Sequence, residues 1–240
     1  MNYQNKLQIK LGINSISWFN KYSTELKFTG IYLILLLASF YTANRFEMKF
    51  NQLNTILIGF SKLLFSIIVL AVMYILYPLI YKTDIHSSHK TYRKFTGKTF
   101  ILGTLVTMIF FLVLHLIVMP LVAQAPSLDL KEVLFSSSSS STSLLPWFLG
   151  STFIAPIQEE FIFRKVILGN LLKKCSNTEA IIISSLLFGL VHLNLQQFIN
   201  AFSSAIILGY WYSKTDSFKF CLWLHMLNNF IVCSFCLFIM

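Results

Sequence analysis

The sequence predicts an all-α fold, a polytopic membrane bundle of about seven (six to eight) transmembrane helices. Hydrophobic residues make up 56% of the chain and charged residues only 12%, whereas soluble domains carry about 25% charged residues. The apolar residues gather in stretches separated by short polar segments, and no internal repeat is apparent. We therefore expect an integral membrane protein, and the Phe-, Ile- and Lys-rich composition favours a bacterial plasma membrane.

The chain is expected to divide into three regions. Residues 1–28 form a basic leader whose aromatic residues suit an interfacial helix, and its start lacks the apolar core of a cleavable signal peptide. Residues 29–144 hold the first membrane helices and a Ser-rich run at 136–143, which predicts a flexible connector. Residues 145–240 hold the remaining helices, which carry the unusual polar residues.

The apolar stretches predict the positions of the helices. A full crossing needs roughly 20 residues, so the first, fifth and sixth stretches are short and are expected either to extend into their polar flanks or to sit where the bilayer is thin. The expected spans are 29–43, 56–81, 100–122, 145–172, 180–193, 198–213 and 219–239.

Lys and Arg residues predict the orientation of the chain. The leader has four of them and the 82–99 loop has five, whereas the 123–144 loop has one. Because basic loops stay on the cytoplasmic side, we expect the N-terminus inside and the C-terminus outside. The net charge of +10 is then explained by membrane orientation, and we expect no nucleic-acid partner.

One apolar stretch carries two adjacent carboxylates, Glu159 and Glu160, and the guanidinium group of Arg164 near its middle. A charge at the bilayer centre costs at least about 2.5–3.5 kcal/mol, so such residues usually mark a site. Glu160 and Arg164 are four residues apart, on one face of a helix, and are expected to pair. Glu159 is turned roughly 100° away and is left to face a cavity.

Two further polar pairs occur in the later helices, Phe188 with His192 and His225 with Asn229. The members of each pair are four residues apart and are expected to project from one face of a helix. Counted from the basic turn near Lys174, both Glu159 and His192 are about 14 residues, or roughly 20 Å, along their helices. His225 and Asn229 are expected at a comparable depth, so the four groups can meet.

These residue types are suited to hydrolysis of an amide bond. A carboxylate removed from water can act as a base on a water molecule, and a neighbouring imidazole can hold the same water. A second histidine and an asparagine amide can stabilise an oxyanion. Alternatively, Glu159, His192 and His225 could ligate one zinc ion, with water as the fourth ligand. The residues also fit a third interpretation, in which each only cross-links helices.

The ordered motifs EExxxR, FxxxH and HxxxN resemble those of the CPBP (Abi) family, which comprises CAAX prenyl endopeptidases and bacteriocin-processing membrane proteins. The resemblance covers residues 145–240 and implies an all-helical intramembrane protease. It implies that Glu159 activates water with His192, that His225 and Asn229 stand on the oxyanion side, and that Glu160, Arg164 and Phe188 support them.

The leading hypothesis is therefore an endopeptidase that cleaves a peptide or membrane protein at the bilayer, in peptide maturation or bacteriocin self-immunity. The alternative is a non-catalytic immunity or scaffold protein that binds a bacteriocin, a sensor kinase or a transporter. A proton-coupled transporter using Glu159 is disfavoured because no repeat is visible.

Overall fold

The computed structural model describes residues 3–49, 55–81, 96–123 and 144–239. Over these residues the chain forms seven helical stretches, as the apolar pattern predicts. The Ser-rich run at 136–143 lies outside the described residues. The first two helices are α1 (Tyr3–Lys49) and α2 (Thr55–Tyr81), and the third consists of α3 (Gly97–Val113), η1 (Leu114–Val118) and α4 (Met119–Ala123). The fourth is a continuous run of α6 (Leu144–Leu149), η2 (Gly150–Ile154), α7 (Ala155–Glu160), η3 (Phe161–Leu168) and α8 (Gly169–Leu171). The last three are α9 (Asn177–Leu190), α10 (Leu195–Thr215) and α11 (Phe218–Ile239).

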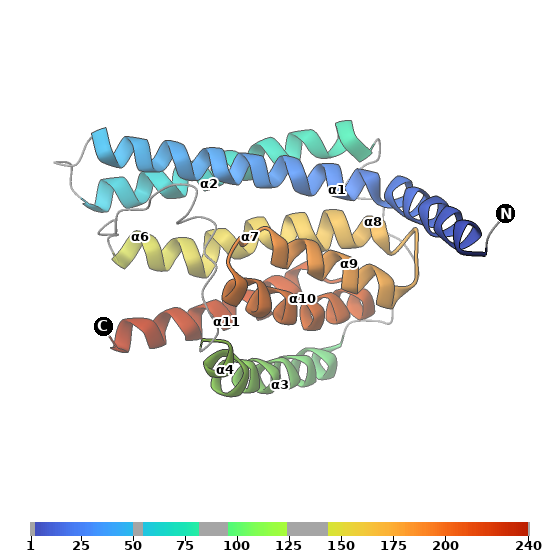
Figure 1. Cartoon of the computed structure of the whole chain (residues 1–240). Coiled ribbons are helices and arrows are strands. Elements are labelled where there is room, and N and C mark those ends of the chain that lie inside the picture. Colours follow the sequence, from blue (N-terminus) through green and yellow to red (C-terminus); the bar gives the residue numbers. More distant parts are fainter. Residues whose placement is uncertain (1–2, 50–54, 82–95, 124–143, 240) are drawn as a thin grey trace.

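The run from α6 to α8 occupies the middle of the bundle (Figure 1). The antiparallel pair α1 and α2 lies on one side of it, and α9, α10 and α11 lie on the other. α3 and α4 form the opposite edge, where they contact α10 and α11. The central position explains why Ile162, Phe163 and Val166 of η3 are fully buried.

The membrane-facing surface confirms the predicted fold class. Three segments are long and apolar enough to cross a membrane, namely Asn20–Ala43, Gly59–Tyr81 and Gly97–Val122. Large apolar side chains on them face outward, such as Leu79 and Leu116, which are 68% and 66% exposed. Burial against lipid is the favourable environment for such side chains, so the chain is an all-α bundle embedded in a membrane.

The expected boundary between the leader and the first span falls inside a single helix. α1 runs without interruption from Tyr3 to Lys49, and its apolar segment already begins at Asn20. Tyr22, Glu25 and Phe28 are fully buried although they precede residue 29. Their spacing of three residues places them on one face, which packs against the bundle and continues the helix through the basic segment.

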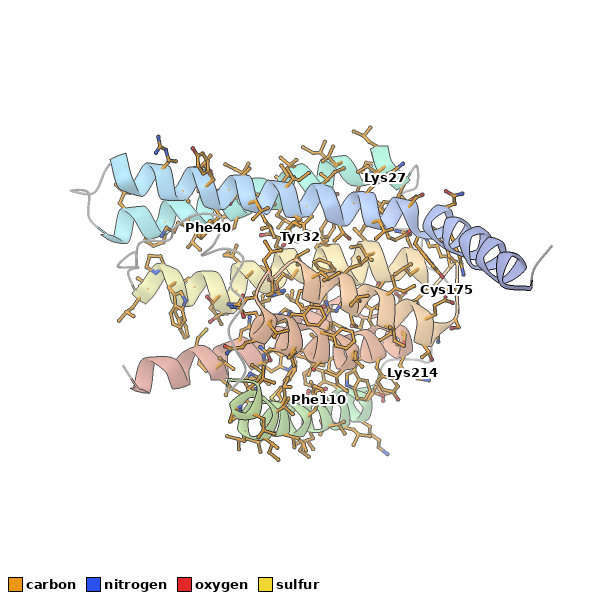
Figure 2. All side chains as sticks on the ribbon, viewed as in Figure 1. Lys27, Tyr32, Phe40, Phe110, Cys175 and Lys214 are labelled. Carbon is orange, nitrogen blue, oxygen red and sulfur yellow. The ribbon has the colours of Figure 1, made fainter. Side chains whose placement is uncertain are left out.

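Polar contacts tie α1 to the turn between α8 and α9. The ammonium group of Lys174 lies 2.7 Å from a carboxylate oxygen of the buried Glu25. The hydroxyl of Tyr22 donates a hydrogen bond to Glu179. Lys27 on α1, Cys175 in this turn and Lys214 on α10 lie toward the same end of the bundle (Figure 2). The basic part of α1, the α8–α9 turn and the end of α10 thus share one end of the bundle.

α9 and α10 form a hairpin that is shorter than a full crossing. α9 has 14 residues, about 21 Å at 1.5 Å per residue, whereas the hydrocarbon core is about 30 Å thick. Gly189 lets the helices approach, because a Cβ atom there would stand 2.8 Å from the ring of Phe198. The chain then reverses through Leu193, which has a positive φ of 56°, and Asn194 caps α10.

α9 ends three residues earlier than the expected span at 180–193. α9 stops at Leu190, so His192 lies in the turn between the helices rather than inside a helix. The hairpin closes there because Leu193 adopts the left-handed conformation and Asn194 accepts a hydrogen bond from the backbone N–H of Gln197.

Candidate active site

The helix that carries the two glutamates is irregular on both sides of them. The segments η2 and η3, before and after α7, have wider turns than an α-helix. Pro156 follows η2 and has no backbone N–H to donate to the preceding turn. Wide turns inside helices occur frequently at functional sites because they redirect side chains.

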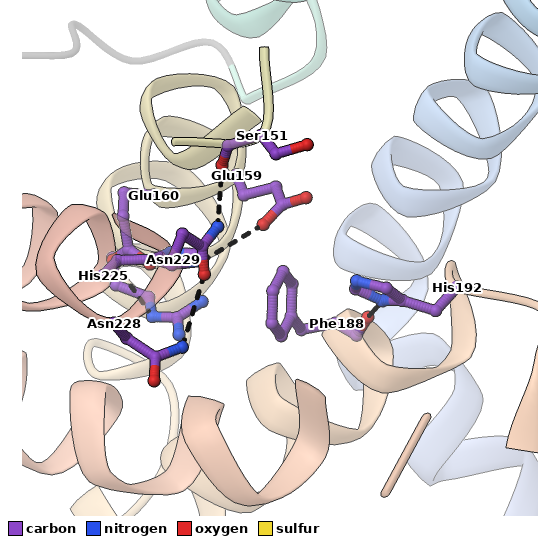
Figure 3. A network of polar contacts seen from close by, with 9 residues as sticks. Ser151, Glu159, Glu160, Phe188, His192, His225, Asn228 and Asn229 are labelled. Carbon is purple, nitrogen blue, oxygen red and sulfur yellow. Dashed lines mark hydrogen bonds and ion pairs between the residues drawn. The ribbon is translucent and has the colours of Figure 1, made fainter. Parts of the chain in front are cut away.

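His225 connects both glutamates (Figure 3). Its Nδ1 atom lies 2.8 Å from Oε1 of Glu160, and its Nε2 atom lies 3.5 Å from Oε2 of Glu159. Glu160 is fully buried, whereas the side chain of Glu159 is 20% exposed. Glu159, which is turned away from Arg164, thus has the imidazole of His225 from α11 beside it.

Arg164 stands behind this pair. Its Nε atom lies 3.3 Å from Oε2 of Glu160, and both side chains are almost completely buried. Its guanidinium group also lies over the ring of Phe188, 4.9 Å from the ring centre. The expected ion pair between Glu160 and Arg164 is thus present, on the side of Glu160 away from His225.

His192 reaches the site from the turn after α9. Its Nδ1 atom lies 2.9 Å from the backbone oxygen of Phe188. Because a carbonyl oxygen can only accept, Nδ1 is the donor in this contact, which leaves Nε2 as the ring atom that can accept a hydrogen bond when the ring carries one proton. The ring of Phe188 makes edge contacts with the imidazoles of His192 and His225, at centroid distances of 5.0 and 6.2 Å (Figure 3).

Asn229 anchors α11 to η2. Its side-chain amide donates to the backbone oxygen of Ser151 at 2.9 Å, and its Oδ1 atom accepts from the amide of Asn228 at 3.3 Å. The amide group has a second N–H, and the bonds to Ser151 and Asn228 leave this N–H unused within the described residues.

One cavity brings these residues together. Its volume is about 320 Å³, and Glu159, His192, His225 and Asn229 all line it, together with Phe188. Glu159, His192 and His225 come from α7, the α9–α10 turn and α11, and each is more than 30 positions from the next in the sequence. The remaining lining residues are Ser151, Ala155, Gln197, Asn200, Ala201, Ser204 and Asn228.

The sequence-based reasoning did not single out the contribution of α10. Gln197, Asn200 and Ser204 line the cavity from this helix. Their spacing of three and four residues is a signal that could have identified them, because such residues share one face of a helix.

The zinc alternative requires three ligands around one point. Within the described residues, no three His, Cys, Asp or Glu side chains are arranged to hold a metal ion. Glu159 and His225 are adjacent, but the ring of Phe188 is in contact with both His192 and His225. As arranged, the set Glu159, His192 and His225 does not fit a zinc ion.

Comparison with known proteins supports the resemblance carried by the motifs. Residues 141–231 match the family described as Type II CAAX prenyl endopeptidase Rce1-like. The chain is also similar to YdiL of Bacillus subtilis (strain 168), whose name describes a candidate membrane peptidase, with 35% identity over 83 residues. This match covers 34% of each chain, so the chain spans about a third of the length of that relative. No solved structure matches the chain significantly. The segment 141–231, which holds all of the motif residues, is thus similar to the CAAX-protease-like membrane proteins of the CPBP family.

Proposed function

We propose that this protein is an intramembrane endopeptidase that hydrolyses a peptide or a membrane-associated protein with a water molecule activated by Glu159 and His192. The observation that carries the proposal is the shared cavity, in which a partly exposed carboxylate, two imidazoles and a carboxamide meet inside an apolar bundle. Keeping such groups together in a membrane is costly, and a helix-packing role does not require a cavity among them.

In the proposed reaction, Glu159 removes a proton from water while Nε2 of His192 accepts a hydrogen bond from the same water. The water oxygen then bonds to the carbonyl carbon of the scissile amide, and the free N–H of Asn229 stabilises the resulting oxyanion. Transfer of the proton to the amide nitrogen allows the C–N bond to break, which releases a carboxylate and an amine.

Glu160, Arg164 and His225 position Glu159 in this proposal. The pairing of His225 with Glu160 fixes the imidazole so that its Nε2 atom faces Glu159. We therefore assign His225 a positioning role between the two glutamates, rather than the role of second oxyanion donor that the motif resemblance implies. Phe188 supports the site by packing against Arg164 and both imidazoles.

The test compares the purified wild-type chain with Glu159→Gln in liposomes that contain proteins extracted from bacterial membranes. New peptide N-termini are identified by mass spectrometry. Because a positioned general base contributes about 10²–10⁴-fold, we expect Glu159→Gln to lower the rate of their formation by at least about 100-fold. Glu179→Gln is the matched control, since Glu179 lies at the end of the bundle and its side chain is 40% exposed.

Two results would contradict the proposal. One is the absence of any new terminus with the wild-type chain, which is the outcome for a non-catalytic immunity or scaffold protein. The other is full activity of Glu159→Gln in a preparation that unfolds at the wild-type temperature, because the carboxylate would then have no role in the reaction.

A further inference from the structure

The α10 wall of the cavity carries polar groups that the motifs do not explain. The hydroxyl of Ser204 and the Oδ1 atom of Asn200 are buried, and neither has a hydrogen-bond partner among the described residues. Ser204 is 7% exposed, and both residues line the same cavity as Glu159 and His192. Polar atoms buried without a partner are unfavourable, so their presence beside a reactive site indicates that a ligand supplies the partner.

The spacing of the two residues matches an extended peptide. Asn200 and Ser204 are four residues apart on α10, about 6 Å along the helix axis. In an extended chain, peptide groups that point to the same side repeat every two residues, about 6.6–6.8 Å. A strand lying along this face can thus place one N–H against Oδ1 of Asn200 and the next N–H on the same side against the hydroxyl oxygen of Ser204, which can also accept. Ala201 lies between them on the cavity wall and leaves space for the strand.

We propose that Asn200 and Ser204 bind the backbone of the substrate in an extended conformation, with Oδ1 of Asn200 and the hydroxyl oxygen of Ser204 each accepting a hydrogen bond from a substrate N–H. This inference rests on the proposed function. The substrate is then defined by its conformation. On both sides of the bond that is cleaved, its backbone forms no helical hydrogen bonds.

The proposal also explains how a peptide can become available to Glu159 inside a membrane. The amide groups of a membrane helix are bonded to each other, and unwinding leaves them unsatisfied in an environment with little water. The two groups on α10 replace part of the lost hydrogen bonds at the place where the chain must be extended. In this proposal α10 therefore positions the substrate and takes no part in the chemical step.

The test uses consecutive serines as a matched pair. Ser204 lines the cavity, whereas Ser203, its neighbour on α10, does not. A synthetic, internally quenched peptide spanning the most abundant site cleaved by the wild-type chain serves as the probe. We expect Ser204→Ala and Asn200→Leu each to raise KM about 3- to 10-fold, as for one hydrogen bond, with kcat unchanged within about twofold. Ser203→Ala is expected to behave as wild type.

An ester scan separates binding of the backbone from a structural role. Replacing one amide of the peptide by an ester removes a single N–H. At one position the ester should raise KM for the wild-type chain about 3- to 10-fold and have no further effect on Asn200→Leu, because the same hydrogen bond is already absent. A purely structural role of Asn200 would give additive effects at every position.

The outcomes distinguish this inference from the function on which it rests. Equal kinetics of Ser204→Ala, Asn200→Leu and Ser203→Ala, with cleavage by the wild-type chain intact, would overturn the inference alone. Additive ester effects throughout would do the same. A wild-type chain that produces no cleavage would overturn the proposed function and the inference together.

Discussion

The Nδ1 atom of His225 lies 2.8 Å from Oε1 of Glu160, although the two residues are 65 positions apart in the chain. This contact joins α11 to α7 and fixes which ring atom faces Glu159. Since Arg164 holds the other oxygen of Glu160, an arginine, a glutamate and a histidine form a buried support for the glutamate that lines the cavity. The predictions below test this support and its surroundings.

The buried ion pair should be essential for stability. Glu160→Gln leaves the guanidinium group of Arg164 buried without a carboxylate, which is expected to lower the free energy of unfolding by about 3–5 kcal/mol. Denaturant unfolding in detergent micelles measures this change. The control is the double variant Glu160→Leu/Arg164→Met, which removes both charges and should recover most of the lost stability. Equal stability of the wild type and the single variant would show that the pair is not needed.

The close approach of α9 and α10 should depend on Gly189. Gly189→Ala places a Cβ atom 2.8 Å from the ring of Phe198 and 3.2 Å from its backbone oxygen, so we expect a loss of about 1–3 kcal/mol in unfolding free energy. Gly30→Ala is the matched control, because no atom lies within 4 Å of its added Cβ. It should be neutral or stabilise α1 by about 0.5–1 kcal/mol. Similar effects of both substitutions would contradict the packing seen here.

Metal removal should leave the proposed activity unchanged. Because Glu159, His192 and His225 are not arranged as three ligands of one ion, we expect cleavage rates within about twofold of the untreated enzyme after incubation with EDTA or 1,10-phenanthroline and removal of the chelator. Metal analysis of the same samples is the accompanying measurement. Loss of activity on chelation, and its recovery with zinc, would instead support the zinc alternative.

The orientation of the chain remains a prediction from its basic loops. In a variant without the four native cysteines, Ser138→Cys should react with a membrane-impermeant maleimide in intact cells. Ser87→Cys, in the basic 82–99 loop, should react only after the cells are permeabilised. The reverse pattern would place the N-terminus outside and would overturn the expected topology.

The positions of the helices could be predicted from the sequence because long apolar stretches identify segments that bury their backbone groups in lipid. The expected span at 56–81 differs from α2 by a single residue. The start of α1 and the end of α9 could not be predicted in this way, because they depend on tertiary contacts. Tyr22 and Phe28 extend the first helix by packing on the bundle, and the reversal at Leu193 ends the fifth.

By itself, the sequence determined that this is a helical membrane protein and which polar residues are out of place in lipid, because composition and helical spacing are local properties of the chain. It also placed Glu160 beside Arg164, four residues away on the same helix. Only the tertiary structure decided that His225 faces both glutamates, that His192 enters from a turn, and that Asn200 and Ser204 complete the cavity. Those relationships join different helices, and the packing angles between helices are set by contacts across the whole bundle rather than by any one segment.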